Sequence, residues 1–387
     1  MAICPICGAA GRPRRRTKPI RNGDVLSRRE LNRALLARQL LLERAKLPAL
    51  KAVERLAGLQ AQSPAAPYYA LWARLESFRQ EELAGLLVTR QAVRIALMRS
   101  TIHLVSAEDC RILRPLLQLV LERGLNGAFG KRLAGTDAAS ITALGRAMVE
   151  AEPLPAHELG RRLSEAVSAD PEALAAAVRT YVPLVQLPPR GLWGESGMAV
   201  HTTAEAWLGR PLLPGTDPEE LVRRYLAAFG PASVRDMQVW SGLTRLRDAF
   251  ERLRPQLAVF RDEHGRELLD LPDAPRPGGD MTAPARFLGE FDNMLLSYED
   301  RSRLLAEGDK PRVFTKNGII RAVFLLDGFA AGTWSIAKER GRAVLTVKSF
   351  MALSHAEEEA LAAEGRLLLA FAEPGLVHEI VFAAPAA

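Results

Sequence analysis

The chain has 387 residues, 48% of them hydrophobic, and a formal net charge of +7. This is enough apolar content for a packed core and roughly two to four domains. Three cysteines exclude a disulfide-stapled scaffold and favour a reducing cytoplasm. No apolar run is long enough to cross a bilayer, so no membrane partner is expected.

Residues 1–24 are expected to form a disordered basic extension, because they lack apolar periodicity and carry six basic side chains against one acid. The remaining chain then has a net charge of only +2. The extension could add non-specific affinity for phosphates. Its Cys4 and Cys7 form a C-x-x-C pair, but a structural zinc ion needs four ligands. We therefore expect no metal site.

Residues 25–115 are predicted to begin with helices and to end in a strand pair. Ser27 and Glu30 have the spacing of a capping box. A second helix is expected from Ala49 to about Leu59, after Pro48. Further helices are expected over 68–78 and 81–90, and a strand pair over 92–106, which is rich in β-branched residues.

Two further blocks, 116–215 and 216–280, repeat this order of elements. In the first block a helix starts at Asp170-Pro171 and precedes a Pro/Gly-rich hairpin. In the second block a hairpin turns around His264 and Gly265. Helix, turn, helix, helix and hairpin in this order are typical of a winged helix-turn-helix unit. The pattern therefore predicts three such units in tandem.

Residues 281–387 are expected to form an antiparallel β module with a closing helix. Three strand-like runs are separated by turns at Asp327-Gly328 and Arg340-Gly341. The predicted fold class is therefore α+β, with three tandem winged units followed by a β-rich C-terminal element.

Basic and aromatic side chains gather at a few places where they could contact DNA. Arginine beside an aromatic ring suits phosphate contact combined with stacking. Each of these residues could equally belong to an ordinary solvated surface. The candidates are Arg190, Trp193, Tyr298, Arg301, Arg303, Lys338, Arg340, Arg342 and Lys348.

Two glutamines, Gln60 and Gln62, stand at the end of the second predicted helix, in "GLQAQSP". Pro64 disfavours helical geometry at Ser63, so the helix should end within this motif. An extended segment would place both side chains on one face. The residues alone also allow a simpler interpretation, in which one amide caps the turn and the other is exposed.

From about Val25 to Glu373 the chain resembles the winged-helix DNA glycosylases typified by AlkZ and YcaQ. The resemblance is carried by stretches such as "GLQAQSPAAPYYALWARL", "STIHLVSAEDC", "LWGESG" and "GEFDNMLLSYEDRSRLL". It implies that Gln60 and Gln62 are the Gln-apolar-Gln catalytic signature of the AlkZ-like branch. It also implies excision of bulky N7-alkylguanines from double-stranded DNA, unhooking of interstrand crosslinks in some members, and self-resistance in antibiotic producers.

An N7-alkylguanine is already cationic, so it can leave without a general acid, and the sugar becomes oxocarbenium-like. Two amides could orient water and stabilise that cation. The expected enzyme is a monofunctional cytoplasmic glycosylase, associated with the nucleoid, monomeric and without a cofactor. The alternatives are a non-catalytic winged-helix DNA-binding regulator and a protein-contact scaffold. Base release and salt-dependent DNA binding would distinguish the three.

Overall fold

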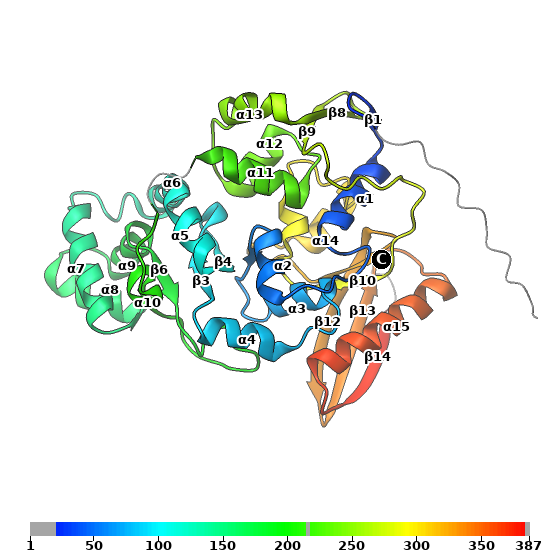
Figure 1. Ribbon diagram of the computed structural model, residues 1–387. Helices are drawn as coiled ribbons and strands as arrows, with labels where there is room; N and C mark the ends of the chain where they lie inside the picture. Colours follow the sequence, from blue (N-terminus) through cyan, green and yellow to red (C-terminus); the bar gives the residue numbers. More distant parts are fainter. Residues whose placement is uncertain (1–20, 214–216, 384–387) are drawn as a thin grey trace, which may run out of the picture.

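The computed structural model describes residues 21–213 and 217–383, which fold into a mixture of helices and three β-sheets (Figure 1). This arrangement confirms the predicted α+β class. The expectations for most of the basic extension, including Cys4 and Cys7, lie outside the described residues. No helix within the described ranges is long and apolar enough to span a membrane.

The helices and strands follow one another along the whole described chain. The helices are α1 Arg28–Arg38, α2 Ala49–Arg55, α3 Ala66–Arg74, α4 Gln80–Val88, α5 Ala107–Leu116, α6 Gln118–Phe129, α7 Ala138–Ala151, α8 Ala156–Ala166, α9 Pro171–Tyr181, α10 Ala204–Leu208, α11 Pro218–Phe229, α12 Val234–Ser241, α13 Arg247–Leu253, α14 Lys310–Val313 and α15 His355–Ala372. The strands are β1 Val25–Leu26, β2 Leu59–Gln60, β3 Ala92–Ala96, β4 Ile102–Ser106, β5 Leu154–Pro155, β6 Leu184–Gln186, β7 Val200–Thr203, β8 Ala258–Asp262, β9 Glu267–Asp270, β10 Arg286–Leu288, β11 Val323–Leu326, β12 Phe329–Glu339, β13 Arg342–Ser349 and β14 Val377–Ala383.

Several local signals in the sequence are confirmed. The Ser27 hydroxyl accepts a hydrogen bond from the Glu30 N–H, and the Glu30 carboxylate accepts one from the Ser27 N–H, which completes the predicted capping box. Asp170 caps α9 by accepting from the Ala173 N–H. The strand pairs β3–β4, β6–β7 and β8–β9 are antiparallel, as the predicted hairpins require.

The predicted helix from Ala49 to about Leu59 is wrong at its C-terminal end. Helix α2 stops at Arg55, because Ala57 and Gly58 adopt positive φ angles of 56° and 86°. The Gly58 N–H donates to the Val53 carbonyl at 2.9 Å, which is the hydrogen bond of a Schellman motif. A Cβ at Gly58 would lie 2.7 Å from Cγ1 of Val105, so only glycine fits against the sheet.

The sheets connect segments that the sequence assigns to different units. One six-stranded sheet has the order β2-β4-β3-β6-β7-β5 and therefore joins strands of the first and second predicted units. Strand β1 pairs in parallel with β8 of the third unit. The division into winged units, with boundaries after residues 115, 215 and 280, stays a prediction.

The C-terminal module differs from its prediction in one strand. Its sheet has the order β10-β11-β12-β13-β14, and both predicted turns are present between β11, β12 and β13. However, the chain continues beyond the closing helix α15 into β14, which pairs with β13 in parallel. Because α15 carries the chain back along the sheet between β13 and β14, the two strands run in the same direction. The module is therefore mixed rather than antiparallel.

The largest buried apolar cluster unites α2 to α5, α11 to α13 and the C-terminal sheet, whereas α7 to α9 pack around a smaller core of their own. Figure 1 places these three helices at one end of the molecule. The large cluster also surrounds buried ion pairs, including Arg74 with Asp292 at 2.8 Å. Strand β2, with Gln60, belongs to this central part of the fold.

Candidate active site

Gln60 ends the edge strand β2 of the six-stranded sheet, and Gln62 follows at a bend two residues later. Gln60 stands opposite His103 in the antiparallel pairing of β2 with β4. The Ala61 N–H continues the pairing by donating to the Ile102 carbonyl at 2.7 Å. The extended pairing reaches as far as Ala61, and the chain bends at Gln62. Gln60 is buried and Gln62 is exposed.

Each carboxamide oxygen accepts a hydrogen bond. Nη2 of Arg99 lies 2.7 Å from Oε1 of Gln60, and the Ile102 N–H lies 3.2 Å from Oε1 of Gln62. Both partners can only donate, so the contacts identify the oxygen of each amide and fix its orientation. Neither glutamine caps the helix that follows, because the N-cap residue of α3 is Ala65 and no side chain caps it. The simpler interpretation is therefore wrong about the cap, although one of the two amides, Gln62, is exposed as it expected.

Arg99 stands on a strained turn between β3 and β4. Arg99 and Ser100 have φ angles of 55° and 60°, in the left-handed region that residues other than glycine seldom occupy. The guanidinium of Arg99 also donates to the Trp240 carbonyl of α12. Burial, together with the nearby Arg301, lowers the pKa of Arg99 to about 10, so it stays charged at neutral pH. Strain of this kind persists where the surrounding structure holds it.

A second contact fixes the backbone of β2. Oδ1 of Asn293 accepts from the Gln60 N–H at 3.0 Å, and its Nδ2 donates to the Gly58 carbonyl at 2.7 Å. The preceding Asp292 forms a two-pronged ion pair with Arg74. Asn293 and Arg99 were not predicted, since they lie far along the chain from Gln60.

A further arginine binds the middle residue of the motif. Nη2 of Arg94 donates to the Ala61 carbonyl at 2.8 Å. Burial, followed by repulsion from Arg190, lowers the pKa of Arg94 to about 10. Gly191 permits this packing, because a Cβ there would lie 2.6 Å from Cδ of Arg94. Positive charge therefore borders the segment at Gln60 and at Ala61.

His103 is a buried neutral imidazole beside Gln60. Its Nδ1 lies 2.9 Å from the Thr101 carbonyl, which can only accept, so Nδ1 carries the proton. Its Nε2 has no hydrogen-bond partner among the described residues. Burial, and secondarily Arg99, lowers the pKa of His103 to about 3. At neutral pH this ring therefore cannot act as a proton donor at the site.

Two of the predicted DNA contacts are buried, and these two predictions are corrected. Tyr298 is fully buried, and its hydroxyl donates to the Phe229 carbonyl. Arg303 is also buried and donates to the Pro231 carbonyl at 2.8 Å, with its guanidinium 4.0 Å from the centre of the Tyr298 ring. The aromatic ring and the arginine do pair, but they pair inside the core.

Three further candidates are partly buried. The Trp193 ring packs 5.1 Å from Tyr68 and 5.4 Å from Phe371. Arg190 donates to the Gly197 carbonyl at 3.0 Å. The Arg301 guanidinium stacks 4.6 Å from the centre of the Phe314 ring. Any contact of these side chains with DNA stays a prediction.

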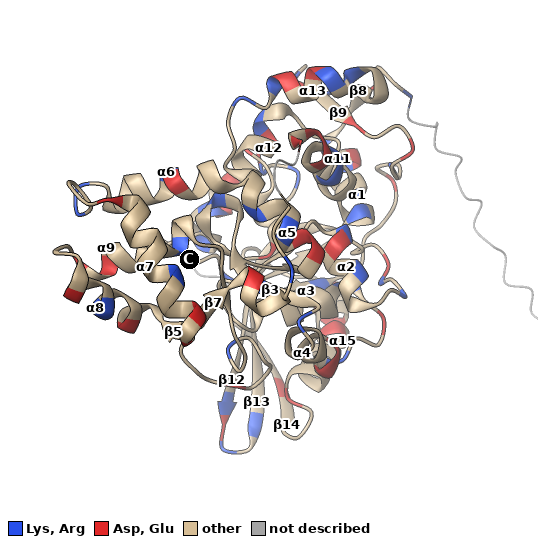
Figure 2. Ribbon diagram, turned by 60° about the vertical axis from the view of Figure 1, so that its left-hand side comes forward, with Lys and Arg blue, Asp and Glu red and all other residues tan. Residues whose placement is uncertain are grey.

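The four remaining candidates lie on the hairpin formed by β12 and β13. Lys338, Arg340, Arg342 and Lys348 are exposed, and Figure 2 shows this basic hairpin projecting from the body of the protein. Lys338 pairs with Glu373 at 2.8 Å and Arg342 with Glu379 at 3.3 Å. The charges are accessible to a polyanion, although two of them already have carboxylate partners.

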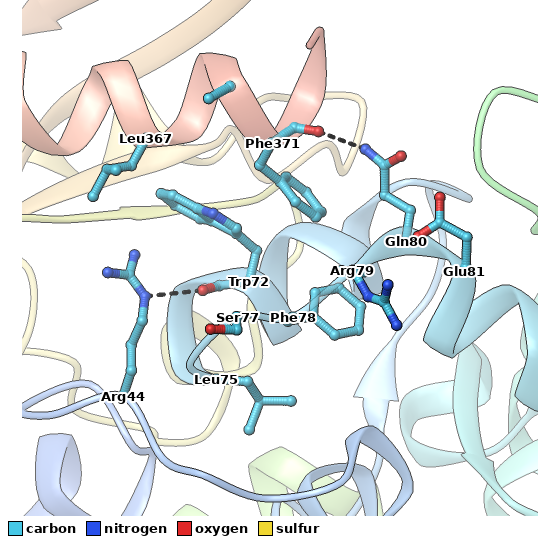
Figure 3. Close-up of a pocket in the computed structure, with 11 residues that line it drawn as sticks. Arg44, Trp72, Leu75, Ser77, Phe78, Arg79, Gln80, Glu81, Leu367 and Phe371 are labelled. Carbon is cyan, nitrogen blue, oxygen red and sulfur yellow. Dashed lines mark hydrogen bonds between the residues drawn. The ribbon is translucent and has the colours of Figure 1, made fainter.

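Cavities lie on both sides of α3. A cavity of about 440 Å³ separates α15 from the turn between α3 and α4 (Figure 3). Two of its lining residues, Gln80 and Arg44, donate to the carbonyls of Phe371 and Trp72, at 2.6 and 3.1 Å. None of the predicted site residues lines it. A smaller pocket of about 260 Å³ borders Ser63, the residue after Gln62.

Comparisons with known proteins agree with this fold. A family described as DNA glycosylase AlkZ-like matches residues 53–371. The fold is similar to that of the solved structure of Streptomyces sahachiroi DNA glycosylase AlkZ, with a TM-score of 0.76 and 21% sequence identity. The similarity covers 93% of this chain and 100% of that chain. A search of curated proteins finds no match.

The family match spans most of the chain, and it includes the glutamine segment, Arg99 and Asn293. The class of protein is therefore a DNA glycosylase, an enzyme that acts on DNA. The chain belongs to the AlkZ-like DNA glycosylase family.

Proposed function

We propose that this protein hydrolyses the N-glycosidic bond of N7-alkylguanines in duplex DNA, with Gln60 and Gln62 as its catalytic residues. One observation carries the proposal. The two amides lie two residues apart at the edge of the sheet, and the donors Arg99 and Ile102 hold both of their oxygens. A site that positions a reactant needs side chains whose orientation is settled before the substrate arrives.

We assign different roles to the two amides on the basis of their hydrogen-bond partners. A charged guanidinium already withdraws electron density from Oε1 of Gln60, so this oxygen is poorly suited to stabilise a cation. Oε1 of Gln62 accepts only from a neutral backbone N–H and keeps a second lone pair. Gln62 then faces the oxocarbenium-like sugar, and Gln60 orients the attacking water.

The only lysine close to the motif in sequence is a poor candidate for a Schiff base. Lys51 is exposed on α2 and pairs with Glu54 at 2.8 Å. This hydrogen bond raises the pKa of Lys51, so the amine stays protonated and is not a nucleophile. The proposed reaction is therefore hydrolysis without strand cleavage.

The exposed β12–β13 hairpin is the proposed contact with the DNA backbone. Lys338, Arg340, Arg342 and Lys348 offer four positive charges for phosphates. The protein would act as a monomer on alkylated DNA in the nucleoid. Unhooking of crosslinks and a role in self-resistance belong to the same proposal, since both require release of a bulky alkylated guanine.

The reaction is tested with a duplex that contains a single N7-methylguanine. We expect release of free N7-methylguanine and an abasic site that alkali converts into a strand break. We also expect no break without alkali and no covalent complex after borohydride reduction. A duplex with ordinary guanine at the same position is the control. A borohydride-trapped complex, or equal release from both duplexes, would contradict the proposal.

A further inference from the structure

A pocket of about 260 Å³ opens directly beside the glutamine segment and combines a carboxylate with aromatic rings. Ser63 and Tyr69 line it from the start of α3, Glu290 from the residues after β10, and Trp334 and Ser335 from β12. Sites for drug-sized ligands have volumes of ~300–1,000 Å³. This pocket therefore suits one small substituent.

Glu290 is placed at the pocket by a tight backbone contact. At Gly289, a Cβ would lie 2.9 Å from Cβ of Tyr69, so the chain passes directly against the ring. Glu290 is exposed as a whole residue, and its partly buried carboxylate has no hydrogen bond or ion pair among residues 21–213 and 217–383. Partial burial raises the pKa of Glu290. A carboxylate that has lost part of its hydration gains from a positively charged neighbour.

The two aromatic rings are held rigidly. Tyr69 and Trp334 meet edge to face, with centroids 5.4 Å apart. Nε1 of Trp334 donates to the Leu288 carbonyl at 2.8 Å, which prevents the indole from turning. Burial, followed by the charges of Glu373 and Glu290, raises the pKa of Tyr69 to about 12, so its ring stays neutral. Neutral rings next to a carboxylate form a recurrent binding site for cations.

The charge at this pocket is opposite to that on the rest of the segment. Arg99 and Arg94 contact the glutamine segment at Gln60 and Ala61. An unpaired carboxylate beside a site for DNA repels phosphates, so neither the DNA backbone nor a neutral base accounts for it. A cation on the substrate does account for it, and an alkylated base can carry one.

We propose that the pocket formed by Ser63, Tyr69, Glu290, Trp334 and Ser335 binds a positively charged amine on the alkyl substituent of the damaged base. This inference rests on the proposed function, because it assumes that an alkylated base is bound beside Gln62. It assigns Glu290 as a specificity residue that selects adducts with a cationic arm.

The experiment compares duplexes that contain N7-(3-aminopropyl)guanine and N7-butylguanine. The two arms have nearly the same size and differ in charge. We expect the protein to bind the aminopropyl duplex roughly three- to tenfold more tightly. Glu290→Gln should abolish this preference. The control is Glu43→Gln, which changes the net charge equally at an exposed glutamate after α1 and should keep the preference.

Equal binding of the two duplexes by the unaltered protein, or an unchanged preference in Glu290→Gln, would overturn the inference. A duplex with N7-methylguanine distinguishes the two possible positions of the charge. If Glu290→Gln weakens binding to that duplex equally, the cation is the purine ring, and the assignment to the arm is wrong. Binding tests the pocket and base release tests the glutamines, so either proposal can fail alone.

Discussion

Two hairpins of this protein carry an arginine at a turn residue with positive φ, and the two arginines have opposite environments. Arg99, between β3 and β4, has a φ of 55° and bonds to Gln60 and to Trp240. Arg340, between β12 and β13, has a φ of 45° and is exposed. The same residue type at a positive φ thus holds a catalytic candidate in one hairpin and faces solvent in the other. Its surroundings, and not its turn, decide its role.

The hairpin formed by β3 and β4 carries His103 and should make the stability of the fold sensitive to acid. The folded pKa of His103 is about 3, below its ordinary value of 6.5, so the unfolded chain binds the additional proton between these values. Its contribution is complete above pH 6.5 and is lost as the pH falls toward 3. We expect a loss of up to about 4 kcal/mol in the free energy of unfolding. Urea unfolding at several pH values measures it.

His103→Leu should remove the His103 share of this loss and leave the share of the buried His201, whose pKa burial lowers to about 4, whereas His378→Leu, on the exposed strand β14, should leave the profile unchanged. If the two variants have the same profile as the unaltered protein, His103 is not the group that titrates.

Removing the Arg99 guanidinium should slow base release. Arg99→Met leaves the amide of Gln60 free to turn, and the expected loss in the single-turnover rate is roughly 100-fold. Arg340→Met is the matched change in the β12–β13 hairpin. It should leave the single-turnover rate of base release from bound DNA within about twofold of that of the unaltered protein, because it removes only a phosphate contact. Arg99→Lys should recover part of the rate, since a lysine can still donate to Gln60.

A merely structural role of Arg99 would be revealed by a double-mutant cycle. If Arg99 acts through Gln60, the combined variant Arg99→Met with Gln60→Ala should be no slower than Gln60→Ala alone. Additive losses would contradict this positioning role.

Glycines next to the two hairpins should differ in their tolerance of alanine. Gly58→Ala would force a Cβ against Val105 at a φ of 86°, with an expected cost of about 2–3 kcal/mol. Gly341→Ala, at a φ of 83°, meets no atom within 4 Å and should cost about 1 kcal/mol. Thermal or urea unfolding of the two variants measures the difference. Equal costs would mean that backbone strain dominates and that the contact with Val105 matters little.

Neutralising basic side chains of the β12–β13 hairpin should weaken DNA binding in a salt-dependent way. Each of Arg340→Gln and Lys348→Gln should reduce the slope of log affinity against log salt by about 1, if each side chain contacts one phosphate. These two residues have no ion-pair partner within the described chain, unlike Lys338 and Arg342. An unchanged slope in both variants would remove the hairpin from the DNA interface.

Local features were predictable from the sequence, whereas contacts between distant segments were not. The capping box at Ser27 and the turn at Arg340-Gly341 depend on neighbouring residues. The bond from Arg99 to Gln60 joins residues 39 positions apart, and the bond from Asn293 joins residues 233 apart. No periodicity in the sequence encodes such a pair.

The assignments that were wrong also depend on contacts between distant segments. "SYEDRSR" is polar and was predicted to contact DNA, but Tyr298 and Arg303 pack against the carbonyls of Phe229 and Pro231. Composition describes a stretch and does not show which of its faces another helix will cover. Strand β14 was missed because its side chains are mostly exposed or half-buried, so it lacks the apolar alternation of a buried strand.

The central claim is that two amides, and not a carboxylate or a lysine, perform the hydrolysis. It is tested most directly by the single-turnover rate of N7-methylguanine release in Gln60→Ala and Gln62→Ala, with Gln91→Ala, an exposed glutamine after α4, as the control. The account predicts a loss of roughly 100-fold in each of the first two variants with DNA affinity retained, and an unchanged rate in the third. Rates near that of the unaltered protein in both Gln60→Ala and Gln62→Ala would contradict it.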